Sequence, residues 1–89
     1  MRWDHMVPYG VHMYLNEDLA ALLEGRRKEL GLGHRSLADR SHTPRSSIKR
    51  YLEDPQAMRL AILLRVLEAL DLSLEDVAAL ERDHHRSAA

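Results

Sequence analysis

Short helical segments, each bounded by glycine, proline or a small polar residue, are the feature of this 89-residue sequence that most limits its fold. From residue 16 onward, apolar side chains recur with the 3.6-residue period of an α-helix. Five such segments account for nearly all of residues 16–83, and a chain of this length has one compact core. We therefore predict an all-α fold, a compact five-helix bundle over residues 16–83.

Helix start and stop signals divide this region into its five segments. Each of four N-termini has a residue that can cap it: Asn16, Thr43, Asp54 and Ser73. Pro44 and Pro55 each follow a cap, at the first helical position where proline is tolerated. Asp76, three residues after Ser73, completes a capping box. We expect helices over about 17–30, 34–41, 44–52, 55–70 and 74–83, with Gly31 ending the first.

The expected core follows from the same periodicity. The fourth segment is the most apolar and covers more than one helical face, which is typical of a central element. Its expected core residues are Met58, Ala61, Ile62, Leu64, Val66, Leu67 and Leu70. The second segment contributes Leu37 and Ala38, where only a small side chain fits the helix crossing, and the third contributes Ile48 and Tyr51.

Residues 1–15 have a different pattern. Their apolar residues fall on odd positions and are interrupted by Pro8 and Gly10, so we predict an N-terminal extended arm. The arm holds Trp3, Tyr9 and Tyr14, three of the four aromatic residues. These side chains are expected either to pack back on the bundle or to contact a partner or second subunit. Residues 84–89 have little to bury and are expected to fray.

Positive charge is concentrated in one part of a chain whose net charge is −1. Residues 26–50 hold eight Lys and Arg against two acidic residues, whereas the flanking segments are acidic. This distribution predicts a positive face of the kind that meets a phosphate backbone, although basic clusters are often simply solvated. The pattern makes nucleic-acid binding a candidate function.

Several other classes of protein do not fit the sequence. The chain has no cysteine, and its six histidines include no pair spaced i, i+4 on a helix, so no metal site is expected. It has no glycine-rich phosphate loop or nucleophile motif, so we expect neither an enzyme nor a cofactor or small-molecule ligand. No apolar run spans a membrane and no signal peptide is evident, so we expect a cytoplasmic protein without membrane contact.

The second and third helices are joined by Ser41, His42 and Thr43, a connection too short for antiparallel packing over their full length. They must therefore cross steeply, as in a helix-turn-helix. With Ile48 and Tyr51 turned inward, the opposite face of the third helix carries only hydrogen-bond donors, basic residues and serines: Arg45, Ser46, Ser47, Lys49 and Arg50. Arginine can meet the O6 and N7 acceptors of guanine together in a major groove.

From about Leu19 to Leu80 the chain resembles the Cro and phage-repressor-like (XRE-type) helix-turn-helix family. The resemblance depends on "LGHRSLADRSHTPRSSIKRYL", on the apolar helix after it, and on "ALDLSLEDV". It implies a five-helix DNA-binding domain with base-reading residues Arg45, Ser46, Lys49 and Arg50. It also implies phosphate contacts, which we assign to His34, Arg35, Ser47 and Arg27.

Three positions depart from the family pattern. His42 stands where the family has glycine in a left-handed turn, which histidine tolerates at a cost of about 1 kcal/mol. His34 replaces a frequent glutamine. Leu52 aligns with a glutamate that often pairs with the first-helix arginine, and Glu53 follows it. Arg27 is therefore expected either to pair with Glu53 or to contact phosphate.

The resemblance implies a sequence-specific double-stranded DNA-binding transcriptional regulator, which we expect to be a small repressor of the phage Cro or immunity type. Many members of the family act as homodimers, so a homodimer is a possible assembly. Two alternatives use the same fold. One is an antitoxin that represses its own operon, and the other is an adaptor that binds protein through the aromatic arm or the fifth helix.

Overall fold

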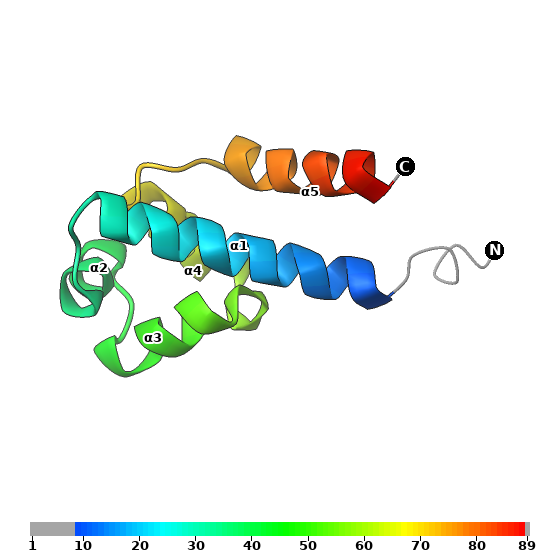
Figure 1. Cartoon of the computed structure of the whole chain (residues 1–89). Coiled ribbons are helices and arrows are strands. Elements are labelled where there is room, and N and C mark those ends of the chain that lie inside the picture. The colour runs from blue at the N-terminus through cyan, green and yellow to red at the C-terminus, as the bar shows by residue number, and fades with distance from the viewer. Residues whose placement is uncertain (1–8, 89) are drawn as a thin grey trace.

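The longest element, α1 (Tyr9–Glu29), lies between α5 and α3 in the view of the computed structural model in Figure 1. The structure describes the backbone of residues 9–88 and the side chains of residues 15–83. After α1 come α2 (His34–Ser41), α3 (Arg45–Glu53), a short 3-10 helix η2 (Pro55–Ala57), α4 (Leu60–Ala69) and α5 (Leu74–Ala88). Residues 9–88 contain no strand. The predicted all-α class is confirmed, with five α-helices in a compact bundle.

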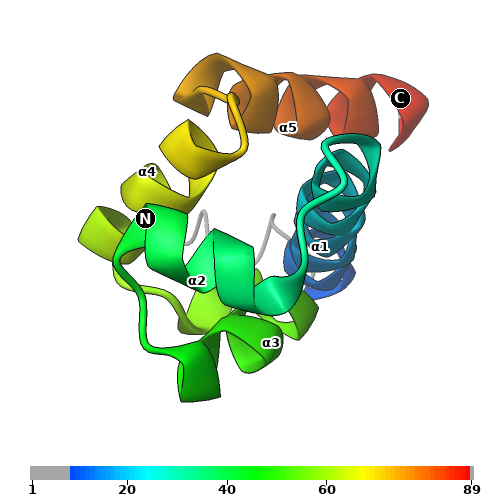
Figure 2. The ribbon, with the colours of Figure 1, turned by 90° about the vertical axis from the view of Figure 1, so that its left-hand side faces the viewer.

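α1 lies at one edge of the bundle when viewed end-on, and the other helices enclose the core beside it (Figure 2). α5 lies along one side of α1 and α3 lies on the opposite side (Figure 1). Viewed from the end of α1, α2 crosses in front of the bundle and contacts both α3 and α4 (Figure 2). This arrangement leaves the outer surface of α3 uncovered by any other described helix.

The core combines apolar residues from α1 to α4 with Met58, which follows η2, and Leu70, which follows α4. Its buried members are Leu19, Leu23, Leu37, Ala38, Ile48, Leu52, Met58, Val66, Leu67 and Leu70. Burial of each leucine contributes about 1.5–3 kcal/mol relative to exposure. The predictions for Leu37, Ala38 and Ile48 are confirmed. In α3, however, Leu52 is buried and Tyr51 is half-buried, because Leu52 lies one helical turn after Ile48.

The predicted fourth helix is wrong in its first part. Pro55–Ala57 form η2, Met58 is extended with φ −79° and ψ 139°, and α4 begins only at Leu60. Met58, Val66, Leu67 and Leu70 are buried as predicted, but Ala61 and Leu64 are exposed and Ile62 is half-buried. α4 buries only one face, which holds Ile62, Val66 and Leu67, whereas Ala61 and Leu64 lie on the other face and remain exposed.

The side chain of Asn16 stabilises the start of η2. Its Oδ1 accepts the N–H of Gln56 at 3.0 Å, and its Nδ2 donates to Asp54 Oδ1 at 2.9 Å. Asn16 was predicted to cap the first helix, and that prediction is wrong because α1 already contains it. It instead connects the middle of α1 to the start of η2.

Both ends of the chain continue further in helix than predicted. Residues 9–15 belong to α1, so the extended-arm prediction is wrong there, and residues 1–8 lie outside the described residues. In this part Tyr9 and Met13, like Val11 and Leu15, are also spaced i, i+4, so the odd-position pattern is equally compatible with a helix. α5 extends through Ala88, where fraying was expected, and its last turns contain basic residues that favour a helix C-terminus.

Two predicted helix boundaries depend on specific residues. The predicted stop at Gly31 is confirmed, since α1 ends at Glu29 and Gly31 follows it in the left-handed conformation, with φ +68°. At the start of α5, the backbone N–H of Ser73 donates to Asp76 Oδ2 at 2.8 Å, which is the acidic half of the capping box. No helix in residues 9–88 is both long and apolar enough to cross a membrane.

Candidate nucleic-acid interface

The turn between α2 and α3 depends on one residue with positive φ. His42 has φ 54° and ψ 40°, the left-handed conformation expected at this position. Its N–H donates to the Asp39 carbonyl at 3.3 Å, and the Thr43 N–H donates to the Ala38 carbonyl at 2.9 Å. These bonds satisfy carbonyls that the last turn of α2 would otherwise leave unpaired. The chain therefore reverses within three residues and α3 crosses α2.

Hydroxyl groups fill the inside of this turn. Ser41 is fully buried, and its Oγ donates to the Leu37 carbonyl at 2.7 Å and lies 2.9 Å from Thr43 Oγ1. Thr43 was predicted to cap the third helix, and this is wrong because its hydroxyl points inward. Pro44 occupies the cap position with ψ 134°, and α3 begins at Arg45.

α4 also supports the turn. Arg65 Nε donates to the Ser41 carbonyl at 2.9 Å, across 24 residues of sequence. This contact could not be predicted from the sequence, because Arg65 lies in an apolar helix with no motif around it. Its effect is to connect the turn to the helix that packs behind it.

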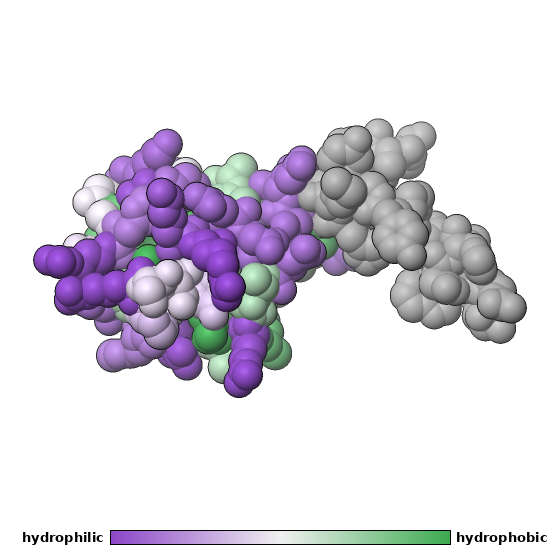
Figure 3. All heavy atoms as spheres, turned by 90° about the horizontal axis from the view of Figure 1, so that it is seen from below, coloured by the Kyte–Doolittle hydropathy of each residue, from purple (hydrophilic) through white to green (hydrophobic). Residues whose placement is uncertain are grey.

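α3 has two clearly different faces. Ile48 and Leu52, spaced i, i+4, are buried against the core. The opposite face exposes four of the predicted DNA contacts, which are Arg45, Ser46, Lys49 and Arg50, while Ser47 is half-buried. Figure 3 views the molecule from the side on which α3 lies, and most of that surface is hydrophilic. The structure therefore brings the predicted base-reading residues together on one exposed helix face.

Arg45, the first residue of α3, is held by a carboxylate from α2. Its Nε lies 3.2 Å from Asp39 Oδ1 and its Nη2 lies 3.2 Å from Asp39 Oδ2, a two-bond contact between exposed side chains. Asp39 could not be recognised as a partner from the sequence, because residues six apart do not share a face of a continuous helix. The turn alone brings the two groups together.

Arg50 has a different support. Its guanidinium carbon lies 5.3 Å from the centroid of the Tyr51 ring, within the range of a cation–π contact. Such a contact leaves the N–H groups of Arg50 available to a ligand. Arg35, a predicted phosphate contact, is exposed on α2, as is Arg40 near its end.

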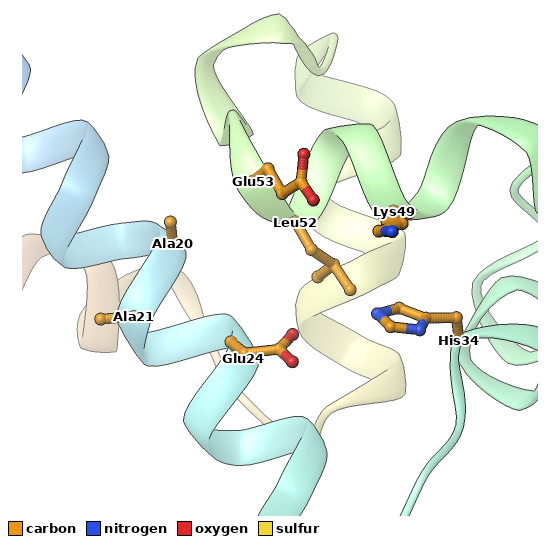
Figure 4. Close-up of a pocket in the computed structure, with 7 residues that line it drawn as sticks. All are labelled: Ala20, Ala21, Glu24, His34, Lys49, Leu52 and Glu53. Atoms are coloured by element: carbon orange, nitrogen blue, oxygen red, sulfur yellow. The ribbon is translucent and has the colours of Figure 1, made fainter.

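His34 and Lys49 share a hollow with two carboxylates. The hollow has a volume of about 360 Å³ and lies between α1, the start of α2 and α3 (Figure 4). Glu24 and Glu53 line it together with His34 and Lys49. Carboxylates beside His34 weaken the attraction of a phosphate to this point, so the position of His34 supports its predicted role less than that of Arg35 does.

Arg27 has an internal role instead of the two that were expected. Its guanidinium makes a two-bond contact with Glu24, and its Nη1 donates to the Leu32 carbonyl at 2.6 Å. The hydrogen bond from Arg27 lowers the pKa of the Glu24 carboxyl below its usual value, and the same bond raises the pKa of Arg27. Arg27 is largely buried and pairs with Glu24 rather than Glu53. The predicted phosphate contact by Arg27 is therefore not supported.

Other predicted contacts fall where the structure gives no side chains. Trp3 lies outside the described residues, and Tyr9 and Tyr14 have a described helical backbone in α1 but no described side chain. Within residues 15–83, no group of three His, Asp or Glu side chains is placed to bind a metal ion.

The interface between residues 34 and 53 thus combines five Lys and Arg with two acidic residues, on a helix pair fixed by a buried turn. This part of the chain therefore carries a net positive charge. A scan against protein-family models finds no match to this chain, and searches of curated proteins and of solved structures find no similar protein.

Proposed function

We propose that this protein is a sequence-specific double-stranded DNA-binding transcriptional regulator of the Cro and phage-repressor-like helix-turn-helix type. The observation that carries the proposal is the outer face of α3. Ile48 and Leu52 anchor the helix, while Arg45, Lys49 and Arg50 are exposed on the side that no described helix covers.

The dimensions of α3 suit a DNA groove. An α-helix with its side chains is about 10–12 Å in diameter, which the major groove of B-DNA, about 12 Å wide, can admit, and the nine residues of α3 give it a length of about 14 Å. A helix of this length reads a few base pairs. Arg45 or Arg50 would bind the O6 and N7 atoms of a guanine. Ser46 has a side chain short enough to let the backbone approach a base edge.

The other exposed cations would supply affinity without sequence preference. Arg35, exposed on α2, is the best-placed of these cations for a phosphate contact, and the hydroxyl of Ser47, half-buried on α3, is the second candidate. Binding of this kind releases counterions from DNA, so affinity falls steeply as salt rises. Occupancy of a promoter by the protein would block transcription, and we propose repression in the cytoplasm of a bacterial cell as its mode of action.

Selection against a random double-stranded DNA library at about physiological salt, followed by sequencing, tests this proposal. We expect an enriched site, and an inverted repeat with half-sites about 34–36 Å apart would indicate a homodimer. The double variant Arg45→Ala, Arg50→Ala should lose the enrichment. Arg59→Ala, an exposed arginine outside α2 and α3, is the matched control and should keep it. Absence of any enriched site for the unmodified protein would contradict the proposal.

An adaptor that binds protein is the second candidate, and one observation favours it. Leu60 and Leu64, spaced i, i+4 on α4, have exposed fractions of 64% and 40%, so they form one exposed apolar strip on that helix. If this surface carries the function, substitution of Leu60 and Leu64 by serine would abolish partner binding and the arginine variants would be neutral.

A further inference from the structure

We infer that Asp39 is a positioning residue that acts through Arg45 and sets the preference for guanine at the base pair that Arg45 reads. The inference rests on the proposed function. It concerns an acidic residue that would stand at a DNA-binding surface, where a negative charge opposes phosphate attraction. A carboxylate at this position therefore does not serve to attract DNA.

The contact between Asp39 and Arg45 has a geometry that holds the guanidinium in one orientation. Both oxygens of Asp39 engage Arg45, one at Nε and one at Nη2, each at 3.2 Å. The two side chains remain 58% and 56% exposed, so the contact lies at the surface and not in the core. The backbone of Asp39 is itself fixed, because its carbonyl accepts the His42 N–H of the turn.

The contact leaves a defined set of donors on Arg45. A guanidinium has five N–H groups. Asp39 takes the Nε–H and one N–H of Nη2, which leaves both N–H groups of Nη1 and the second of Nη2. The remaining Nη1 and Nη2 donors lie side by side on the edge opposite Nε. Two adjacent donors match the O6 and N7 acceptors of guanine.

A guanidinium held in one orientation discriminates between bases better than one that can reorient. An arginine on a flexible side chain can reorient toward a phosphate oxygen or toward single acceptors on other bases. Asp39 reduces these alternatives and lowers the conformational entropy that Arg45 loses on binding. Its charge also weakens attraction to any phosphate, so its expected effect is lower affinity for random DNA and higher selectivity for the cognate site.

The test uses the full chain with Asp39→Asn, which keeps the shape of the side chain and removes its charge and one acceptor. Affinity is measured for the selected DNA site and for the same site with the guanine read by Arg45 replaced by adenine. We expect the ratio of the two affinities to fall about two- to fivefold, the range of an exposed ion pair of about 0.4–1 kcal/mol. Asp18→Asn on α1, also an exposed carboxylate, is the charge-matched control and should leave the ratio unchanged.

A double-mutant cycle separates positioning from a structural role. Arg45→Lys identifies the base pair that Arg45 reads, and adding Asp39→Asn to it should change the ratio no further. The inference is overturned if Asp39→Asn leaves the ratio unchanged or raises it, weakens both sites equally, or acts as strongly in the Arg45→Lys background. If the unmodified protein selects no site at all, the proposed function fails together with the inference, and that outcome is distinct from the others.

Discussion

Arginines from a single basic segment, residues 26–50, take opposite roles in α1 and in α3. At the end of α1, Arg26 Nε donates to the Leu70 carbonyl at 3.0 Å and Arg27 Nη1 donates to the Leu32 carbonyl. In α3, Arg45 and Arg50 are exposed and make contacts with side chains. Helix ends and the loops after them have unpaired carbonyls, and a guanidinium nearby binds them. The outer face of a helix has none, so arginines there remain available for a ligand.

The largest effect that tests this contrast is expected at Arg27. Substitution Arg27→Met should lower the free energy of unfolding by about 2–3 kcal/mol, because Glu24 and the Leu32 carbonyl both lose a charged hydrogen-bond donor. Urea denaturation measures the loss. Arg35→Met on the exposed surface of α2 is the matched control and should change stability by less than about 0.5 kcal/mol. Similar losses for the two variants would remove the distinction between inward and outward arginines.

Arg50 should show the reverse behaviour. Arg50→Ala is expected to cost about 1–3 kcal/mol of discrimination at one base pair, while stability falls by no more than about 0.5–1 kcal/mol, the value of its contact with Tyr51. Binding to the cognate site and to singly substituted sites measures this. Arg35→Ala should instead weaken all sequences alike and make the logarithmic dependence of affinity on salt less steep by about 1. An equal loss on cognate and random DNA for Arg50→Ala would assign it to phosphate contact.

Substitutions at His42 and Gly31, which both have positive φ, test how much the backbone conformation at the turn contributes to stability. His42→Gly should stabilise the protein by about 1 kcal/mol, because glycine adopts the φ of 54° without strain. Gly31→Ala, at φ +68°, should destabilise it by a similar amount. Thermal unfolding measures both. If both variants change stability in the same direction, the conformation of the turn residue does not control stability here.

The smallest expected effect is the pH dependence of the Arg27–Glu24 pair. Arg27 holds the pKa of Glu24 below its usual 4.5, so at acid pH the unfolded chain binds a proton more readily than the folded one. The contribution of the pair to stability is therefore complete above about pH 4.5 and is lost as pH falls through the lower folded pKa. Urea denaturation from about pH 6 down to about pH 3 should show a shallower acid loss for Glu24→Gln. An identical slope for Glu24→Gln and the unmodified protein would contradict the prediction.

Signals of short range were sufficient to predict most of the helical framework. The bounds of α2, the left-handed Gly31 and His42, and the burial of Leu37, Ala38 and Ile48 were all predicted correctly. Predictions that depended on extending one pattern over a longer stretch were less accurate. Residues 9–15 proved helical, and the segment after Pro55 divided into η2 and α4, because a neighbouring helix and the Asn16 contacts decide these cases.

In the candidate site too, features set by nearby residues were predicted and contacts between distant residues were not. The helical period was enough to place Arg45, Ser46, Lys49 and Arg50 on one exposed face of α3. It was not enough to identify Asp39, Arg65 or Glu24 as partners, because each contact joins side chains that only the packed helices bring together. Arg27 is the clearest example. A phosphate contact was predicted from its positive charge, but in the structure its guanidinium binds the Glu24 carboxylate and the Leu32 carbonyl.

The amino-acid sequence by itself determined that this chain is helical, where its short turn lies, and which face of α3 carries positive charge. These properties depend on backbone preferences and on residue spacing within a few turns of helix. The tertiary structure alone decided which charges remain available. Hydrogen bonds such as those from Arg27 to Leu32 and Glu24, or from Arg45 to Asp39, form where folding places a donor beside an acceptor at the required distance and angle.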